Sequence, residues 1–293
     1  MKPSSFGYSR PESVAEAIAT LASIGPEGKV LAGGQSLVPL LNLRLAAPSH
    51  LVDINRLSEL AFISVSDGQV TVGALARHAE VLRDPVAAAA QPLLGQALKL
   101  VAHPVIRNRG TTVGSIVHAD PAGEMTAVLA LLGGSLRLVS TSGERFVHAE
   151  DFFLGPLESD VRPGELAAEA RFPALAARAG CAFAEVSRRS GDYAVCGVAA
   201  LVELDAGGMI GSAKAAYLSV GGTPVVLDLT PGCAGRGADC FAEAGRFAMS
   251  LLKPGDDIHA TAAYRRHLAG VLTERALDEA FAHARGRAGG EEK

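Results

Sequence analysis

Short turns rich in glycine, placed directly beside strand-like apolar segments, constrain the fold of this chain more than any other feature. Glycine accounts for 33 of the 293 residues, about 11%, whereas about 7% is usual. The clearest case is the apolar stretch 29–31, which runs into Ala32-Gly33-Gly34-Gln35-Ser36. Small residues let a backbone approach a ligand closely, and consecutive amides can curl around an anion. This placement indicates loops at strand ends rather than a flexible linker.

Composition and charge exclude several classes of protein. Hydrophobic residues make up 48% of the chain and charged residues 20%, which is enough apolar material for a core and excludes intrinsic disorder. The net charge of −4 gives no electrostatic reason to expect nucleic acid or an anionic membrane as a partner. No apolar run approaches the roughly 18 residues of a membrane-spanning helix. The N-terminus lacks the apolar block of a signal peptide, so a cytoplasmic location is expected.

The four cysteines are too dispersed for a local metal or cluster motif. Cys181, Cys196, Cys233 and Cys240 include no C-x-x-C pair, so we expect neither an iron–sulfur cluster nor a structural zinc site within this chain. No Ser/His/Asp or Cys/His signature and no H-E-x-x-H motif is present, and the histidines are interpreted as structural. The sequence therefore predicts no catalytic side chain and no metal ligand.

Hydrophobic periodicity predicts the order of helices and strands. Residues 1–55 are expected to form a helix–strand–loop–strand unit, with a helix that opens at Pro11 and strands at 29–31 and 50–54. The next part is expected to contain one strand at 64–73, helices at 92–101 and 124–132, and a hairpin over 136–147. Beyond about residue 178 the pattern predicts a three-stranded antiparallel sheet followed by helices at 239–252 and 261–284. The three strands are placed at 182–188, 195–204 and 213–220.

A second glycine-bearing loop spans residues 106–115 and leads toward Asp120. The hydroxyl groups of Thr111, Thr112 and Ser115 could bind phosphate or sugar oxygens, and Asp120 could accept a hydrogen bond from a ring N–H. A structural interpretation stays open beside this one, because Thr, Ser and Gly loops also cap helices and Asp-Pro often starts a turn. Each loop taken alone is therefore weak evidence for a ligand.

Five segments stand in a fixed order along the chain, and together they are specific. They are residues 31–42, Leu51-Val52-Asp53-Ile54-Asn55, Ile106-Arg107-Asn108-Arg109-Gly110-Thr111, His118-Ala119-Asp120-Pro121 and Arg188-Arg189-Ser190-Gly191-Asp192-Tyr193-Ala194. In this order they resemble the FAD subunits of molybdenum hydroxylases, a group that includes bacterial carbon monoxide dehydrogenase and the xanthine dehydrogenase family. The resemblance covers residues 3–290, essentially the whole chain.

The resemblance implies an α+β fold of the vanillyl-alcohol-oxidase type (PCMH-like). Residues 1–55 would be an N-terminal α/β FAD-binding subdomain, and residues 56–177 would be a second FAD-binding subdomain. Residues 178–293 would form a C-terminal domain in which the three-stranded antiparallel sheet packs against helices.

The resemblance also implies which residues contact FAD. The first loop would wrap the diphosphate with its backbone amides, since no Arg or Lys lies between Ala32 and Leu43. Residues 111–115 would hold the other side of the dinucleotide, and Asp120 would lie near ribityl or ring atoms. Leu166 would lie near the adenine, with a plain core leucine as the alternative, and Tyr193 would lie beside the isoalloxazine ring. The full set is Leu31, Ala32, Gly33, Gly34, Gln35, Ser36, Ile106, Gly110, Thr111, Thr112, Gly114, Ser115, Asp120, Leu166 and Tyr193.

Val113 departs from the family pattern. The second loop usually reads Thr-Ile-Gly-Gly, and Val113 stands where the first of those glycines is expected, with Gly114 at the second. A β-branched residue tolerates positive φ poorly. Position 113 therefore has an ordinary φ in this chain, or the loop has shifted.

The function implied by the resemblance is electron transfer. FAD on this chain would take electrons from two [2Fe-2S] clusters on a small iron–sulfur subunit and pass them to an external acceptor. The molybdenum cofactor would be held by a large subunit, with the complex paired as a dimer of heterotrimers. Two alternatives are a stand-alone FAD-dependent oxidase or dehydrogenase of the vanillyl-alcohol-oxidase fold, and an assembly module without cofactor. In such complexes the molybdenum subunit selects the substrate, so this sequence sets neither substrate nor acceptor.

Overall fold

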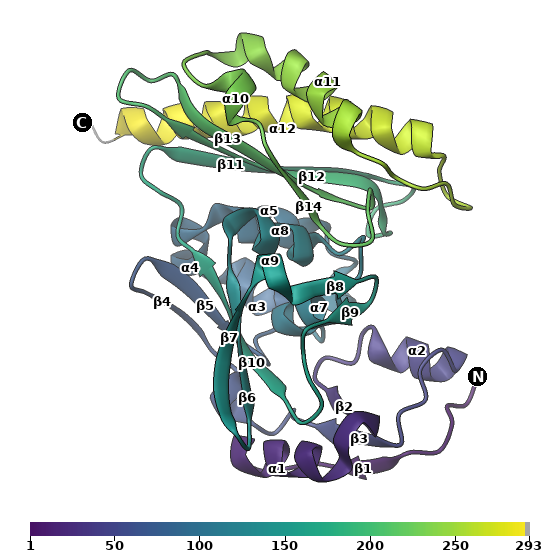
Figure 1. Ribbon diagram of the computed structural model, residues 1–293. Helices are drawn as coiled ribbons and strands as arrows, with labels where there is room; N and C mark the ends of the chain where they lie inside the picture. Colours follow the sequence, from purple (N-terminus) through teal and green to yellow (C-terminus); the bar gives the residue numbers. More distant parts are fainter. Residues whose placement is uncertain (291–293) are drawn as a thin grey trace.

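Three larger β-sheets follow one another along the molecule, each with its own helices (Figure 1). The computed structural model describes residues 1–290. In Figure 1 the N-terminal sheet lies at the bottom, a five-stranded sheet lies in the middle, and a four-stranded sheet lies at the top beneath the long helix α12 (Ala262–Gly290). The mixture of sheets and helices confirms the predicted α+β class.

The first sheet contains three parallel strands in the order β1-β3-β2. They are β1 (Gly7–Ser9), β2 (Gly28–Leu31) and β3 (His50–Asp53). Helix α1 (Val14–Ile24) begins later than the predicted Pro11, because the Ser13 hydroxyl caps it by accepting a hydrogen bond from the Glu16 amide at 3.1 Å. A 3-10 turn, η1 (Gly25–Glu27), leads into β2, and α2 (Leu37–Leu43) follows the first glycine loop.

The second sheet contains five strands in the order β4-β5-β10-β6-β7, all paired antiparallel. Its central strand β10 comes from later in the chain than the other four, so the sheet closes only when the whole N-terminal half is present. Its strands are β4 (Ile63–Ser66), β5 (Gln69–Gly73), β6 (Ser135–Ser140), β7 (Gly143–His148) and β10 (Leu166–Pro173).

The single strand expected at 64–73 is wrong, since the structure has a hairpin there. β4 and β5 pair antiparallel across a two-residue turn at Asp67 and Gly68, whose φ angles are 50° and 70°. Two successive positive φ values are typical of the tight turn that suits the twist of a hairpin, and Asp-Gly is a favoured sequence for it. The alternation of apolar residues on either side obscured this signal.

Short helices and connectors fill the space between the second and third sheets. Helices α5 and α8 were predicted closely, at 92–101 and 124–132, and the structure places them at Pro92–Leu100 and Glu124–Leu132. The remaining elements of this part are η2 (Ser58–Leu60), α3 (His78–Arg83), α4 (Pro85–Ala90), α6 (Pro104–Arg107), α7 (Thr112–His118), α9 (Ala149–Phe152), β8 (Phe153–Gly155) and β9 (Glu158–Ser159).

The third sheet has four antiparallel strands, so the expectation of three strands is corrected. The additional edge strand β14 covers only four residues and follows a stretch with two glycines, so the sequence pattern gave no strand prediction there. The elements are β11 (Ala179–Ser187), β12 (Ala194–Leu204), β13 (Ile210–Leu218), β14 (Val225–Asp228), α10 (Thr230–Cys233), η3 (Ala238–Cys240) and α11 (Phe241–Leu251).

The third sheet is covered on both faces. Alternate residues of β11, including Ala179, Cys181 and Phe183, belong to the same core as the second sheet and its helices. Ala182 of the same strand faces the other way, into a core shared with α11 and α12. Helix α12 lies so close that a Cβ on Gly180 would come within 2.1 Å of the Ala280 carbonyl oxygen. Across residues 1–290, the helices are too short or too polar to cross a membrane.

Candidate functional site

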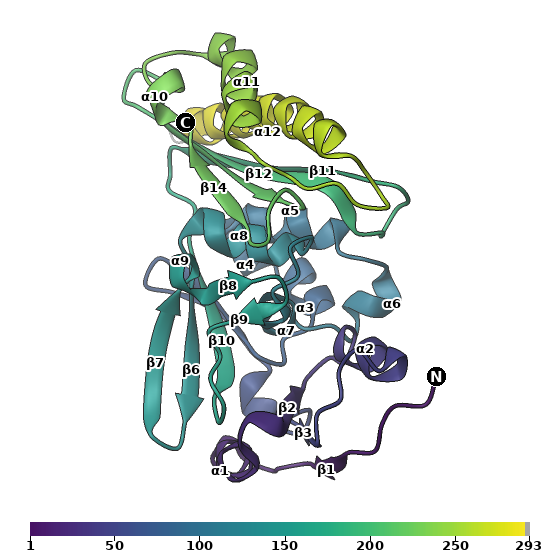
Figure 2. The ribbon, with the colours of Figure 1, turned by 45° about the vertical axis from the view of Figure 1, so that its right-hand side comes forward.

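The two glycine-bearing loops touch each other through their backbones. A Cβ on Gly33 would lie 2.4 Å from the carbonyl oxygen of Arg109 and 2.8 Å from the Cα of Gly110. Real Cβ atoms do not approach backbone so closely, so only glycine fits at position 33. Figure 2 shows α2 and α7, the helices that follow the two loops, on the same side of the molecule. The structure therefore brings together the two segments that the sequence indicated separately.

In the first loop most backbone carbonyls are hydrogen-bonded within the protein, whereas the backbone amides of residues 33–36 lack partners among residues 1–290. The amides of residues 33–36 donate no hydrogen bond to another residue in the part of the chain described. Ser36 stands at the N-cap of α2, yet its hydroxyl accepts no bond from that helix. Gln35 folds back, with its Nε2 donating to the Gly33 carbonyl at 3.1 Å. Successive free amides of this kind form a concave donor surface suited to an anion.

The second loop is partly helical, and this resolves the alternatives for Val113. Helix α7 begins at Thr112, and the Thr111 hydroxyl caps it by accepting from the Gly114 amide at 3.1 Å. Val113 has a helical conformation with ordinary φ, and its side chain is buried in the core. The hydroxyl of Thr111 thus serves the helix, as the structural interpretation suggested. Gly114 and Ser115 are half-buried in the first turn of α7.

Thr112 is held from inside the protein by a buried histidine. The Oγ1 atom of Thr112 lies 3.2 Å from Nδ1 of His78, and its amide donates to the Ala76 carbonyl at 3.3 Å. Burial lowers the pKa of His78 to about 4, with a further contribution from Arg107. His78 is therefore neutral at physiological pH, and it orients the second loop rather than acting as a base.

Asp120 lies where the two halves of the chain meet. Its Oδ1 atom accepts from the Ala122 amide at 2.9 Å, which forms a turn of the kind expected for Asp-Pro. The carbonyl of Pro121 accepts from the Ser219 amide at 2.8 Å, so this turn is tied directly to the end of β13. The carboxylate of Asp120 is thereby fixed at the rim of a cavity.

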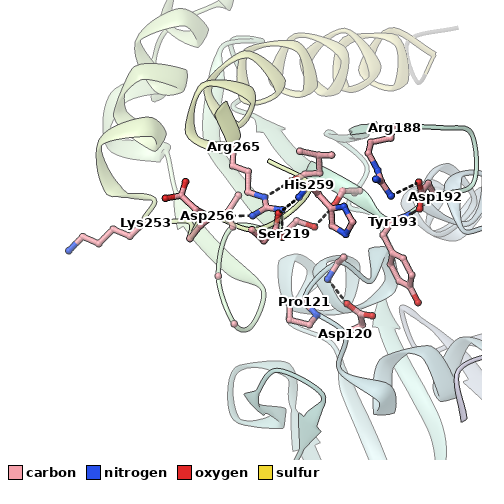
Figure 3. Close-up of a pocket in the computed structure, with 18 residues that line it drawn as sticks. Asp120, Pro121, Arg188, Asp192, Tyr193, Ser219, Lys253, Asp256, His259 and Arg265 are labelled. Atoms are coloured by element: carbon pink, nitrogen blue, oxygen red, sulfur yellow. Dashed lines mark hydrogen bonds and ion pairs between the residues drawn. The ribbon is translucent and has the colours of Figure 1, made fainter. Parts of the chain in front are cut away.

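This cavity, of about 610 Å³, lies between the Asp120 turn and the end of the third sheet. Tyr193 lines it from the C-terminal half, and 66% of that residue is exposed. Figure 3 shows the phenol projecting from the third sheet toward the side of Asp120, while Lys253 points away into solvent. The exposed aromatic face and the fixed carboxylate border the same space, so together they could contact a ring held there.

Three of the residues predicted to contact FAD have apolar side chains: Leu31, Ile106 and Leu166. Leu166 is only 2% exposed and starts β10, so its side chain belongs to the core. Leu31 ends β2 and is half-buried beneath the first loop, and Ile106 accepts backbone bonds from Arg109 and Gly110 through its carbonyl. Any contact of Leu166 with a ligand would therefore have to be made by its backbone.

Sequence reasoning missed two carboxyl groups, one buried and one half-buried, where the two halves of the chain meet. Glu124 begins α8 and is only 8% exposed, and burial raises its pKa to about 8, with contributions from Glu185 and Asp120. Glu185 lies on β11, burial raises its pKa to about 7, and its Oε2 atom has no hydrogen-bond partner among residues 1–290. Sequence reasoning also missed Arg77, whose side chain donates a hydrogen bond to the second loop at the Arg109 carbonyl, because no local motif indicates this contact. In the described part of the chain no three His, Cys, Asp or Glu side chains gather as a metal site.

Comparison with known proteins identifies the same family over almost the whole chain. The family described as "FAD binding domain in molybdopterin dehydrogenase" matches residues 4–175. The family described as "CO dehydrogenase flavoprotein C-terminal domain" matches residues 181–280. The chain is 40% identical to the alpha subunit of the 6-hydroxypseudooxynicotine dehydrogenase complex of Paenarthrobacter nicotinovorans, over 97% of both chains.

Solved structures agree with this match. One is the carbon monoxide dehydrogenase of Hydrogenophaga pseudoflava that lacks the Mo-pyranopterin moiety, with a TM-score of 0.91, 35% identity, and coverage of 97% of this chain and 99% of that one. Another is quinoline 2-oxidoreductase of Pseudomonas putida 86, with a TM-score of 0.90, 36% identity, and coverage of 98% and 99%. The predicted resemblance and fold are confirmed, and the chain belongs to the FAD-binding family of the molybdopterin dehydrogenases as an oxidoreductase component.

Proposed function

We propose that this chain is the FAD-carrying electron-transfer subunit of a heterotrimeric molybdenum hydroxylase. In this role it takes electrons from [2Fe-2S] clusters of a partner and delivers them to an external acceptor. The contact at Gly33 supports the proposal most directly, because it joins the first loop, whose amides are free, to the second loop in one cradle. The similarity to chains named as subunits of dehydrogenase complexes supports the heterotrimeric setting.

The residues present fit FAD. The free amides of residues 33–36 and the Ser36 hydroxyl would hold the diphosphate, which needs several donors in a small space. Gly114 and Ser115 would flank it from the second loop, and Asp120 would accept a hydrogen bond from the ring or ribityl chain. FAD, when bound, supplies one- and two-electron chemistry, so the protein has only to bind, orient and shield it.

The proposed partners are a small iron–sulfur subunit and a large molybdenum-cofactor subunit, assembled as a dimer of heterotrimers in the cytoplasm. Similar chains are named as a medium chain of carbon monoxide dehydrogenase and as an FAD-binding subunit of xanthine dehydrogenase. One similar structure is described as a carbon monoxide dehydrogenase that lacks the Mo-pyranopterin moiety of its molybdenum cofactor. These names place the relatives in larger assemblies and support the same arrangement for this chain.

Purification of the native protein from its source tests the proposal. We expect an absorption spectrum with flavin bands, together with iron and molybdenum in near-stoichiometric amounts and two further chains in the same particle. Flavin without either metal, combined with turnover of an organic substrate by this single chain, would contradict the proposal. That result would instead establish the stand-alone flavoenzyme.

Replacement of Tyr193 with alanine tests the placement of the flavin ring. The side chain is exposed, so its removal should leave the folded protein intact. An aromatic contact with a flavin ring is worth about 0.5–1.5 kcal/mol, so the Tyr193→Ala variant is expected to bind FAD up to about 10-fold more weakly. Its bound flavin should fluoresce more strongly, because the stacked phenol no longer quenches it. The Tyr193→Phe variant should keep the affinity, and an unchanged spectrum in the alanine variant would refute the contact.

A further inference from the structure

We propose that Arg77 and Asn55 form a clamp that fixes the spacing between the two glycine-bearing loops before FAD binds. The inference deepens the proposed function, because it concerns how the same cradle is built. Neither residue belongs to the set of FAD contacts implied by the family resemblance, although Asn55 ends one of the five segments that carry it. Both are therefore positioning residues, which act through the loops rather than by touching the reacting ring.

A continuous path of hydrogen bonds connects the two loops. Nδ2 of Asn55 donates to the Ala32 carbonyl at 2.8 Å, and its Oδ1 accepts from Nη2 of Arg77 at 2.7 Å. Nη1 of Arg77 donates to the Arg109 carbonyl at 2.6 Å. That carbonyl oxygen is the atom that faces Gly33. The clamp thus forms hydrogen bonds with both loops next to the point where they come closest.

The Arg77 end of the clamp is anchored to the second loop by backbone. The amide of His78 donates to the Gly110 carbonyl at 2.9 Å, and the amide of Thr112 donates to the Ala76 carbonyl. Arg77 itself lies opposite Thr111 in an isolated β-bridge. These backbone contacts hold Arg77 in a fixed position relative to the second loop. Its side chain can therefore fix the position of the first loop relative to the second.

The Asn55 end is anchored to the first sheet. Oδ1 of Asp53 accepts from the Asn55 amide at 2.9 Å and from its Nδ2 at 2.6 Å, which holds the side chain in one orientation. Because β2 and β3 are parallel, their ends lie at one edge of the sheet, and Asn55 is placed beside the first loop. The clamp therefore joins the edge of the first sheet to the start of α7.

The charge of Arg77 is left without a carboxylate partner. Arg77 forms no ion pair within residues 1–290, although it is half-buried. The nearby carboxylates are engaged elsewhere, since Glu80 accepts from the Arg77 backbone amide and Asp53 accepts from Asn55. Burial, followed by the like charge of Arg109, lowers the pKa of Arg77, while the charges of Glu80 and Asp53 act in the opposite direction. A planar guanidinium with two fixed bonds is well suited to this bridging role, and its positive charge lies beside the cradle for an anionic ligand.

The test is a titration of the full-length apoprotein with FAD. Arg77→Met and Asn55→Leu each remove one residue of the clamp, with its two hydrogen bonds in the path, and keep side-chain size. Each should weaken FAD binding about 10- to 100-fold, which is the effect of losing a charge-assisted hydrogen bond. Because both act through one path, the double variant should bind little worse than either single variant. Arg56→Met, which removes an exposed arginine near the same strand end, is the matched control and should bind FAD normally.

Hydrogen exchange of the apoprotein supplies a readout independent of activity. In Arg77→Met the hydrogen-bonded amides at the two ends of the clamp, those of Ile54, His78 and Thr112, should exchange faster, while exchange elsewhere and the unfolding midpoint stay unchanged. Full affinity in Arg77→Lys would overturn the clamp, because charge alone would then suffice. Additive losses in the double variant, or faster exchange throughout the chain, would also overturn it. If the unmodified apoprotein binds no FAD, the proposed function itself fails, which is a distinct result.

Discussion

Replacing Gly33 with alanine is expected to lower the affinity of the apoprotein for FAD by at least about 100-fold, since losing two charge-assisted hydrogen bonds has an effect of this size. The added Cβ would meet the carbonyl oxygen of Arg109 at 2.4 Å and the Cα of Gly110 at 2.8 Å, and backbone atoms cannot rotate out of the way as a flexible side chain can. The loops must therefore separate, which spoils the alignment of their amides toward one diphosphate. Calorimetric titration of FAD into the apoprotein measures the change.

A glycine elsewhere in the chain provides a control for this substitution. Gly95 lies in α5, and a Cβ at this position would meet no atom within 4 Å. Gly95→Ala should bind FAD normally and gain up to about 1 kcal/mol in stability, because alanine loses less conformational freedom on folding. If Gly33→Ala binds FAD as tightly as Gly95→Ala, the cradle is not built on the contact between the two loops.

Replacing Glu124 with glutamine is expected to change how stability depends on pH. The folded protein keeps the proton of Glu124 up to about pH 8, whereas the unfolded chain releases it near the ordinary value of 4.5. The folded state thus binds more protons in this window, so the free energy of unfolding of the wild type falls as pH rises from about 4.5 to 8. Glutamine does not titrate, so the free energy of unfolding of the variant rises relative to that of the wild type between about pH 4.5 and 8. Above pH 8 this relative gain stays constant.

The size of this effect follows from the difference in proton affinity. Each tenfold difference is worth about 1.4 kcal/mol, so the gain across the window is on the order of a few kcal/mol. Urea unfolding at three pH values between 5 and 8.5 measures it. Glu279→Gln on the exposed face of α12 is the matched control, because it removes an exposed carboxyl group. A difference between Glu124→Gln and the wild type that stays the same at every pH would contradict the prediction.

Local chemistry made much of the fold predictable from sequence. Helix α8 ends at Leu132 because Gly133 takes a φ of 62° and closes it, and α5 begins with Pro92 at a position where proline is preferred. The first glycine loop could be recognised because apolar strand residues run directly into Gly33 and Gly34. In each case the deciding information lies within a few neighbouring residues.

Contacts between distant parts of the chain were beyond local patterns. Nothing around Gly33 indicates that its backbone meets Arg109, and nothing around Arg77 indicates a partner at Asn55. Glu124 lies in an apolar stretch whose pattern predicts a helix, but its burial depends on β12 and β13 packing on that helix. Each of these features exists only after strands and loops from separate parts of the chain have assembled.

Because the third sheet is covered on both faces, its strands contribute to both apolar cores and link the stability of the two halves of the chain. Because Ala179, Cys181 and Phe183 complete the core of the N-terminal half, neither half can be removed without leaving an apolar face in water. We therefore expect the segments matched by the two family descriptions to unfold together rather than as independent modules. A substitution that destabilises the core around α12 would therefore lower the fraction of native molecules. The glycine loops of the molecules that stay native would keep their geometry.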